Sequence, residues 1–457
     1  MEISIGSIND TLPEELKAEL RARDKETKKR QWAHFEEKLD APNAREIVDA
    51  FKELYGIYDE GLIRWMANLF DPDICVCNEL YGKTECEHHP LCGTAGFHYT
   101  HSGRDHVGYL PVVEAMNSMF DFLDSCGITD REHIGEYFGE ELSEKMMAFV
   151  TNLQDPNGFF YHPQWGKEIG IGRRCRDYDR ALLMLARYGR KPKYPTMADS
   201  EGGDLLVPDN MKTLDAFKEY LATLDLDHRS YHVGSVLSEQ VSTLKTRGTE
   251  YIETLADFFN SHQRADNGIW NEKCDYYGSN GLMKIAGAYT KMEKPIPNPE
   301  LAMQAAIAAI MSDEDPDTIV TVWNPWVSVR SLLKNIRAYH SPELAKKLLG
   351  EIHKLAPEAI RITKEKTLKF KKPDGSFSYL QEYSTWTMQG APCAIPRTVE
   401  GDMDAGVLGT NSMVWVISDA LGMDREDGVP IYGEYEAALF KNIITNRKPV
   451  RKSAENI

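Results

Sequence analysis

Six residues of the kinds that bind metal ions lie close together near the start of the chain. They are Cys75, Cys77, Cys86, His88, His89 and Cys92. Thiolates and imidazoles are the preferred ligands of zinc, and a short loop has no apolar core of its own to hold it in shape. We therefore expect residues 73–94 to form an insertion around a structural zinc ion. Because the spacing matches no standard zinc motif, a disulfide-bonded loop and free thiols remain the alternatives.

A second group of residues suits acid–base chemistry. Glu400, Asp402 and Asp404 lie on one Gly-containing loop, and Asp105 lies far from them in the sequence. Paired carboxylates hydrolyse glycosidic bonds, one as an acid and the other as a base or nucleophile. We expect this loop to face Asp105. Asp402 or Asp404 would serve equally well as the N-cap of the apolar helix that follows.

A third group suits β-elimination from a uronate sugar. Such a lyase needs a cation that binds the carboxylate and a base that removes the neighbouring C5 proton. Arginine fits the first role because its guanidinium presents two parallel donors. Tyr276, Tyr277 and His232 are candidates for the second role. For the arginine-rich run at 173–180, a salt-bridge network at a helix start is the alternative.

Two sets of site residues follow from these patterns. The predicted catalytic residues are Tyr276, Tyr277, His232, Asp105, Glu400 and Asp402. The predicted substrate-binding residues are His101, Arg104, Arg173, Arg174, Arg176, Asp177, Trp165, Trp270, Asn280, Trp323 and Asn324. Aromatic rings stack on sugar rings, while the polar side chains bind hydroxyl and carboxylate groups, so this lining favours a carbohydrate. Packing in the core is the competing role for the aromatic members.

The elements that carry these residues repeat along the chain. A helix, a short turn with Asp, Pro or Asn, a glycine and then aromatic residues occur at 149–161, 258–270 and 368–379. A further copy is split: it begins at 68–72, and its Gly96-Phe97-His98-Tyr99 comes only after the insertion. Repeats of this kind indicate a helical repeat architecture.

Helical spacing of apolar residues recurs in about fourteen segments between residues 44 and 446. Strand signals are few, and residues 319–323 are the clearest. We therefore predict an all-α fold in which about six or seven helical hairpins close into an α/α toroid, with an open solenoid as the alternative. The predicted parts are a charged helical arm (1–45), the toroid with its insertion (46–446) and a flexible tail (447–457).

The segment Gln263-Arg264-Ala265-Asp266-Asn267-Gly268-Ile269-Trp270 resembles the Gln–Trp repeat of terpenoid cyclases and protein prenyltransferases. Gln154, Gly158 and Phe160 form a weaker copy. In that superfamily the motif is structural, so the resemblance implies an α/α toroid rather than cyclase chemistry. The Asp-X-Asp-Asp acid motif of the cyclases is absent. In site chemistry the chain is more similar to the α/α-barrel polysaccharide lyases and glycoside hydrolases.

Composition narrows the possible partners and location. The net charge is −18, whereas nucleic-acid binding needs a basic face. No apolar run approaches the ~18 residues of a transmembrane helix. The start Met1-Glu2-Ile3-Ser4-Ile5-Gly6 lacks a signal peptide, which favours the cytoplasm and reduced thiols. The sequence carries no signal of the oligomeric state.

We expect the chain to be a carbohydrate-active enzyme that cleaves uronate-containing oligosaccharides or polysaccharides by β-elimination. A glycoside hydrolase with paired carboxylates on the same toroid is the alternative. An isoprenoid cyclase or transferase and a non-catalytic glycan-binding protein are further alternatives. Beyond the zinc of the insertion, no cofactor is expected.

Overall fold

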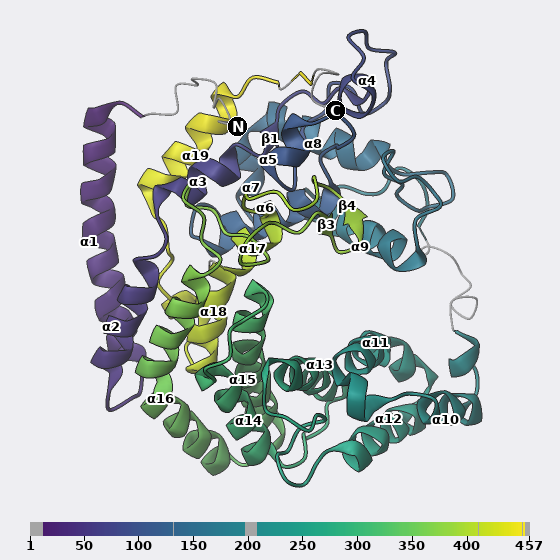
Figure 1. Ribbon diagram of the computed structural model, residues 1–457, viewed down its shortest axis with the longest axis vertical. Coiled ribbons are helices and arrows are strands. Elements are labelled where there is room, and N and C mark those ends of the chain that lie inside the picture. Colours follow the sequence, from purple (N-terminus) through teal and green to yellow (C-terminus); the bar gives the residue numbers. More distant parts are fainter. Residues whose placement is uncertain (1–11, 131, 197–207, 410, 450, 453–457) are drawn as a thin grey trace.

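Helices account for most of the described chain, and its strands are only two residues long (Figure 1). The prediction of an all-α fold is therefore confirmed. The computed structural model describes residues 12–130, 132–196, 208–409, 411–449 and 451–452. The first eleven residues of the predicted arm and residues 453–457 of the predicted tail lie outside the described residues.

The elements of the first half are α1 (Glu14–Lys38), α2 (Ala44–Tyr55), α3 (Glu60–Ala67), β1 (Phe70–Asp71), α4 (Val76–Tyr81), β2 (Gly96–Phe97), α5 (His101–Asp105), α6 (Val113–Ser125), α7 (Ile134–Phe138), α8 (Glu140–Asn152), α9 (Ile171–Arg187), η3 (Asp209–Met211) and α10 (Leu214–Ala222). Those of the second half are α11 (Leu226–Arg247), α12 (Thr249–His262), α13 (Tyr276–Met292), α14 (Pro299–Met311), α15 (Ile319–Tyr339), α16 (Pro342–Leu368), β3 (Thr387–Met388), β4 (Ala391–Pro392), α17 (Met403–Leu408), α18 (Asn411–Ala420), η4 (Arg425–Asp427) and α19 (Glu434–Asn446). None of the described helices is both long enough and apolar enough to span a membrane.

Most of these helices follow one another in pairs. The pairs are α3 with α6, α8 with α9, α10 with α11, α12 with α13, α14 with α15, and α16 with α17 and α18. The second helices of the pairs pack in a continuous row: α9 against α6, α6 against α17 and α18, α18 against α15, α15 against α13, and α13 against α11. Figure 1 shows α17, β3, β4 and α9 on one side of the middle of the molecule, and α11 and α13 on the other.

The repeated turns share one buried aromatic position. Phe97, Phe160, Trp270 and Phe377 are each at most 1% exposed. Phe160 forms an antiparallel bridge to Gln154, and Phe377 forms the same bridge to Lys371, at equal spacing along the chain. Phe97 pairs with Phe70 between β1 and β2. Burying a large aromatic ring contributes roughly 2–3 kcal/mol. The split first copy therefore has the same turn as the others, with the insertion in place of its tip.

Glutamine side chains connect successive pairs through these turns. The Gln263 amide donates to the carbonyls of Gly268 and Pro297, both at 2.7 Å. The Gln154 amide donates to Tyr194 at 3.0 Å and accepts from the Tyr194 N–H at 2.9 Å. Pro297 precedes α14, so Gln263 joins its own turn to the loop that begins the next helix pair.

Lys371 occupies the corresponding position in the last turn. Its ammonium donates to the Ile57 carbonyl at 2.5 Å and the Asp59 carboxylate at 2.6 Å. Asp59 is the N-cap of α3, accepting from Gly61 N at 2.9 Å. The last helix pair is thus attached to the start of the first.

The predicted strand at residues 319–323 was wrong, because these residues begin helix α15. The β-branched run favours a strand, but Ile319, Val322, Trp326 and Val329 are buried at i, i+3, i+7 and i+10. This spacing lies on one face of a helix, and burial of that face outweighs the weak local preference. Pro325 lies inside α15 as well.

The end of the chain, predicted to be a flexible tail, makes specific contacts up to residue 452. Arg447 donates to the Asn68 side chain at 2.6 Å. Arg451 pairs with Asp73 at 2.6 Å, and Lys452 is 4% exposed. These contacts fasten Arg447, Arg451 and Lys452 to the first helix pair and its insertion.

Gly268→Ala tests the structural role of the repeated turn. Gly268 has φ +72°, and a Cβ there would lie 2.6 Å from Ala302 N. We expect the substitution to lower the free energy of unfolding by about 3 kcal/mol, from left-handed strain plus overpacking. Gly350→Ala is the control, because Gly350 is inside α16 with no atom near its Cβ position and should stabilise by about 0.5–1 kcal/mol. Equal denaturation midpoints for Gly268→Ala and wild type would contradict this role.

Candidate functional site

Three thiols of the insertion converge. The Sγ atoms of Cys75, Cys86 and Cys92 all lie within 4.8 Å of one another, and Cys86 also hydrogen-bonds the Cys77 thiol. Cys75 directly precedes α4, and Cys77 lies in its first turn. All four thiols are free, so no disulfide joins them. Cys75, Cys86 and Cys92, which we call the thiol cluster, can bind a metal ion.

Backbone N–H groups donate to these sulfur atoms. The amides of Val76 and Cys77 donate to Cys92, and the amide of His88 donates to Cys86. The His88 amide is the main cause of the lowered pKa of Cys86, because it stabilises the thiolate. Burial instead raises the pKa of Cys92 to about 12. Amide-bonded sulfur atoms fit a metal site, because thiolate is the form that binds metal.

The two predicted imidazole ligands lie apart from the thiol cluster. His88 is exposed and has a left-handed backbone at φ +56°. The His89 Nδ1 atom accepts a hydrogen bond from the Leu91 N–H at 3.2 Å. No metal-binding group of the described residues includes either histidine. The structure thus brings three of the six predicted ligands together, with Cys77 beside them.

Asp402 is a helix N-cap. Its carboxylate accepts from Tyr379 N at 2.7 Å, Ala405 N at 2.9 Å and Thr385 N at 3.3 Å. The Tyr99 hydroxyl adds a fourth donor at 3.3 Å. Asp402 is fully buried, and these donors hold α17 against the last repeated turn. Asp402 was predicted to be a catalytic residue or a helix N-cap, and its contacts are those of an N-cap.

Asp404, two residues further along, has fewer partners. It is partly buried, and the Tyr99 hydroxyl lies 3.5 Å from its Oδ2. Burial, followed by the charges of Asp402 and Glu114, raises the pKa of Asp404 to about 7, while Arg176 opposes that shift. A carboxyl group with this pKa can give or take a proton near neutral pH.

Residues of other helices are linked to Asp404 by a series of pairwise electrostatic interactions. Tyr379, whose pKa burial raises to about 12, interacts electrostatically with Tyr231 on α11. Glu239 on α11 interacts with Asp179 on α9 and with Lys284 on α13. We name the group formed from both sides the central cluster: Glu114, Arg176, Asp179, Tyr231, Glu239, Lys284, Tyr379 and Asp404. It contains proton donors, proton acceptors and cations within one electrostatic environment.

The arginine-rich start of α9 forms an ion-pair network. Buried Arg173 pairs with Glu114 at 2.5 Å and with Asp177, and donates to the Met388 carbonyl at 3.1 Å. Arg176 also pairs with Glu114 but is 37% exposed. The alternative of a salt-bridge network thus describes Arg173 and Asp177, whereas Arg176 also belongs to the central cluster. Arg174 is partly buried, with no ion pair among the described residues.

Asp105, predicted to face the 400–406 loop, pairs with its own neighbour. Arg104 donates to both carboxylate oxygens of Asp105 at 2.6 and 2.7 Å and to the Asn68 carbonyl at 2.7 Å. Although burial opposes it, this pairing keeps the pKa of Asp105 below its usual value. His101 lies 3.2 Å from the Trp65 carbonyl, and burial lowers its pKa to about 3. These partners fix all three side chains.

Glu400 lies beside that segment rather than in the central cluster. Its Oε2 accepts from Ser102 N at 2.9 Å, and burial raises its pKa. Tyr276 is also buried, donating weakly to the Glu314 carbonyl at 3.4 Å under the Lys366 ammonium. The structure does not join these predicted catalytic residues into one site.

Two further predicted catalytic residues, Tyr277 and His232, are exposed. The aromatic side chains predicted to bind substrate lie in different places. Trp270 is fully buried and donates to the Phe259 carbonyl at 2.8 Å. Trp165 stacks on the His162 ring at 3.9 Å, and Trp323 is partly buried. Trp270 therefore packs in the core.

The predicted residues Asn280 and Asn324 lie together between α13 and α15. The Asn324 amide donates to the Asn280 side-chain oxygen at 2.8 Å, and Asn324 is 2% exposed. This contact fastens two second helices of the row. It makes the pair a packing contact rather than an open substrate site.

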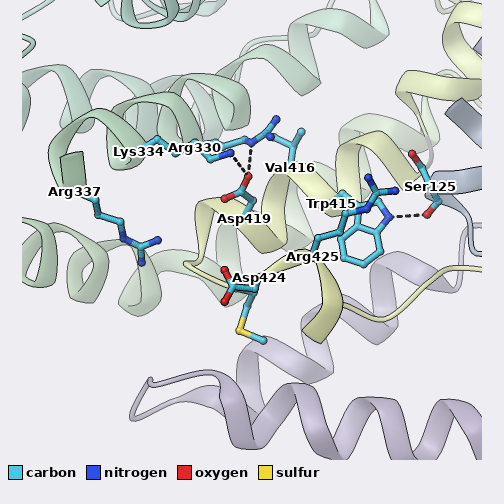
Figure 2. Close-up of a pocket in the computed structure, with 10 residues that line it drawn as sticks. Ser125, Arg330, Lys334, Arg337, Trp415, Val416, Asp419, Asp424 and Arg425 are labelled. Carbon is cyan, nitrogen blue, oxygen red and sulfur yellow. Dashed lines mark hydrogen bonds and ion pairs between the residues drawn. The ribbon is translucent and has the colours of Figure 1, made fainter. Parts of the chain in front are cut away.

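A cavity of about 410 Å³ lies elsewhere, between α15, α18 and η4 (Figure 2). Figure 2 shows Arg330 and Lys334 directed at Asp419, and the Trp415 indole directed at Ser125. None of the predicted site residues is among those that line it. Its ion pairs fasten α15 to α18.

Sequence reasoning missed Glu114, Tyr231, Glu239 and Tyr379. Glu114 carried a usable signal, since it is one acid within the apolar helix 112–123 and is 3% exposed. A charge at such a position needs a partner, which Arg173 supplies. Tyr231 and Glu239 carried no comparable signal, because their place in the cluster depends on the packing of α11.

Comparison of the chain with models of protein families, with curated proteins and with solved structures finds no match.

Proposed function

We propose that this chain is a carbohydrate-active enzyme that hydrolyses glycosidic bonds, with Asp404 as the general acid. The carrying observation is the contrast between Asp404 and Asp402 on one loop. Asp402 is saturated by donors, while Asp404 is partly accessible with a pKa raised to about 7. A protonated carboxyl group donates its proton to the leaving glycosidic oxygen, and the resulting carboxylate is neutralised by Arg176 nearby.

The second carboxylate of such a reaction would come from the opposite side of the central cluster. Glu114 is bound by Arg173 and Arg176, so it is a poor base. Glu239 and Asp179 are exposed and interact with each other. We assign the role of activating water to Glu239, because it interacts with Lys284 and forms no salt bridge among the described residues.

Aromatic surface near the cluster supports a sugar as the substrate. Tyr231 and Trp386 are each 47% exposed, which is unusual for large aromatic side chains. Trp386 directly precedes β3. The Met388 carbonyl of β3 accepts a hydrogen bond from Arg173, which belongs to the ion-pair network at the start of α9. Flat apolar faces beside acids and arginines suit a ring that carries hydroxyl groups.

β-Elimination from a uronate sugar is the second candidate. It is favoured by the partial exposure of Arg176 and Arg180, at 37% and 33%, which would bind the carboxylate. The base would be Tyr379 or Tyr231. Tyr379 has a pKa raised to about 12, which disfavours the phenolate needed to remove a proton. This penalty ranks elimination below hydrolysis.

The architecture that we propose for this site is an α/α toroid of six helix pairs. The row of second helices from α9 to α11 supports it, as do the electrostatic contacts of Asp179 with Glu239 across the two ends of the row. The side chains of Gln154, Gln263 and Lys371, which connect consecutive pairs, also support it. The resemblance to Gln–Trp repeats agrees with this arrangement.

Asp404→Asn tests the proposed acid. We expect it to reduce kcat about 10²–10⁴-fold, because the amide cannot donate the proton. Wild-type kcat/KM should fall as the pH rises through about 7, where Asp404 loses its proton. The measurements are reducing-sugar release and ultraviolet absorbance of unsaturated product, made on a panel of glycans with and without uronate.

Asp209→Asn is the matched control, because the Asp209 side chain is 94% exposed on η3. It should keep wild-type activity. New absorbance alongside new reducing ends would favour elimination over hydrolysis. No product from any glycan, or an Asp404→Asn variant with full activity, would contradict the proposal.

We also propose that the metal of the thiol cluster is a structural zinc ion, with Cys77 as the fourth ligand. Four thiolates form a closed tetrahedral site, which is typical of structural rather than catalytic zinc. The Glu87 N–H donates to the Cys77 sulfur at 3.3 Å, as the other amides do to Cys86 and Cys92. The insertion has little apolar core, so the ion would supply its cohesion.

Cys92→Ser tests the zinc ion. We expect the cobalt-substituted wild type to show thiolate-to-metal charge-transfer absorption. The variant should lose most of this absorption, and it should bind about one equivalent of metal less than the wild type. Cys175→Ser is the control, since Cys175 is an exposed thiol on α9 far from the insertion in sequence. If the wild-type protein shows no thiolate absorption, the thiol cluster does not bind this metal.

A further inference from the structure

A second group of metal-binding side chains lies beneath the insertion. Asp71 ends β1, His98 directly follows β2, and Glu79 lies on α4. The antiparallel register pairs Phe70 with Phe97 and Asp71 with Gly96, so Asp71 and His98 are diagonal neighbours on one face of the two strands. All three side chains are at most 1% exposed.

Several polar atoms of this group have no hydrogen-bond partner among the described residues. They are Asp71 Oδ2, Glu79 Oε2 and both ring nitrogens of His98. An unpartnered buried polar atom costs about 1–3 kcal/mol. His98 is the strongest case, because its whole imidazole is buried and burial keeps its pKa well below the usual value. It is therefore a neutral ring with a free lone pair, which is the form that binds metal.

The separations match a coordination site. One ligand atom from each of the three residues lies within 4.8 Å of the other two. His98 Nε2 and Glu79 Oε2 are 3.4 Å apart, yet neither takes part in a hydrogen bond. Two atoms that each lie about 2.1 Å from a tetrahedral zinc ion are about 3.4 Å apart.

We propose that Asp71, Glu79 and His98 bind a divalent transition-metal ion of the zinc class. This buried triad is separate from the thiol cluster and needs none of its ligands. One imidazole and two carboxylates are ligands that zinc accepts, and three protein ligands leave a fourth position for water. The first repeat would then hold two ions, each with a ligand in α4 or directly before it.

Lys452 is the nearest cation, and its contacts lie mainly outside the triad. Its ammonium donates to the Tyr109 carbonyl at 2.6 Å and the Gly103 carbonyl at 3.2 Å. It also forms an ion pair with Glu79 Oε2 at 3.6 Å, which is too long for a hydrogen bond. Arg451 acts on Glu79 from further away and is itself paired with Asp73 at 2.6 Å. Asp71 Oδ2 has no partner among the described residues, so a bound cation would offset its charge.

A shared proton is the rival explanation for the charge. Burial raises the pKa of Asp71 to about 6 and that of Glu79 to about 7, so one carboxyl group can be neutral. One proton between Glu79 Oε2 and His98 Nε2 would pair these two atoms and leave Asp71 Oδ2 and His98 Nδ1 without partners. A metal ion binds an atom from each of the three residues at once, so it accounts for more of the group.

The two metal sites share one short helix. The Cys75 N–H donates to Glu79 Oε1 at 2.9 Å, while the other oxygen of Glu79 faces His98. Cys75 belongs to the thiol cluster. Glu79 is therefore oriented by the first site for its role in the second.

The test is a metal titration of the full-length, chelator-treated protein with Co²⁺ and with Zn²⁺, followed by elemental analysis after dialysis. We expect two equivalents of metal per chain. One equivalent of Co²⁺ should bring thiolate charge-transfer absorption, and the other should add only weak visible bands. A single equivalent with thiolate absorption would overturn the proposal.

A single equivalent without thiolate absorption would support the triad and contradict zinc at the thiol cluster, so the two metal proposals fail separately. The wild-type titration needs no variant to fold. His98→Gln should then lower the stoichiometry by one while keeping the thiolate absorption. His133→Gln, at an exposed histidine, should keep both equivalents. Unchanged stoichiometry in a folded His98→Gln variant would also overturn the proposal.

Discussion

The repeated turn between paired helices is the constraint on which the rest of the structure depends. Each turn buries one aromatic ring, and in three of them a polar side chain extends to the loop that begins another helix pair. The ring fixes where the second helix starts, and the polar contact fixes how far the next pair is rotated. Asp404 lies in the first turn of α17 and Arg176 in the second turn of α9, so the repeated turns that start these helices also position both residues.

Much of the fold was predictable from the sequence because its signals are local. Helical periodicity and the repeated glycine–aromatic turns lie within short windows, and the split copy was recognised from its residues alone. The strand predicted at Ile319–Trp323 failed because burial of one helix face is a tertiary effect that overrides β-branched preference. The long α16 likewise continues through Pro357, although a proline inside a helix removes a backbone hydrogen bond.

The candidate site was less predictable because polar residues are used first for structure. Asp105 is taken by the adjacent Arg104, Asp402 by backbone amides, and Trp270 by the core. The sequence shows which residues carry useful groups, but not which of those groups are already satisfied. That depends on partners such as Glu114, which lies 59 residues from Arg173. A candidate site residue differs from a structural one because some of its hydrogen-bond donors or acceptors have no partner in the folded chain.

The position of Lys452 has a consequence for how the segment around α4 is held. Its ammonium stands 3.6 Å from Glu79, and its backbone N–H donates to the side chain of Asn78 at 2.8 Å, across 374 positions of sequence. Such a contact forms only when both segments are folded against each other, so it reports on the completed fold and not on any local element. A substitution at Lys452 would therefore leave every described helix in place and loosen the segment around α4 from the rest of the molecule.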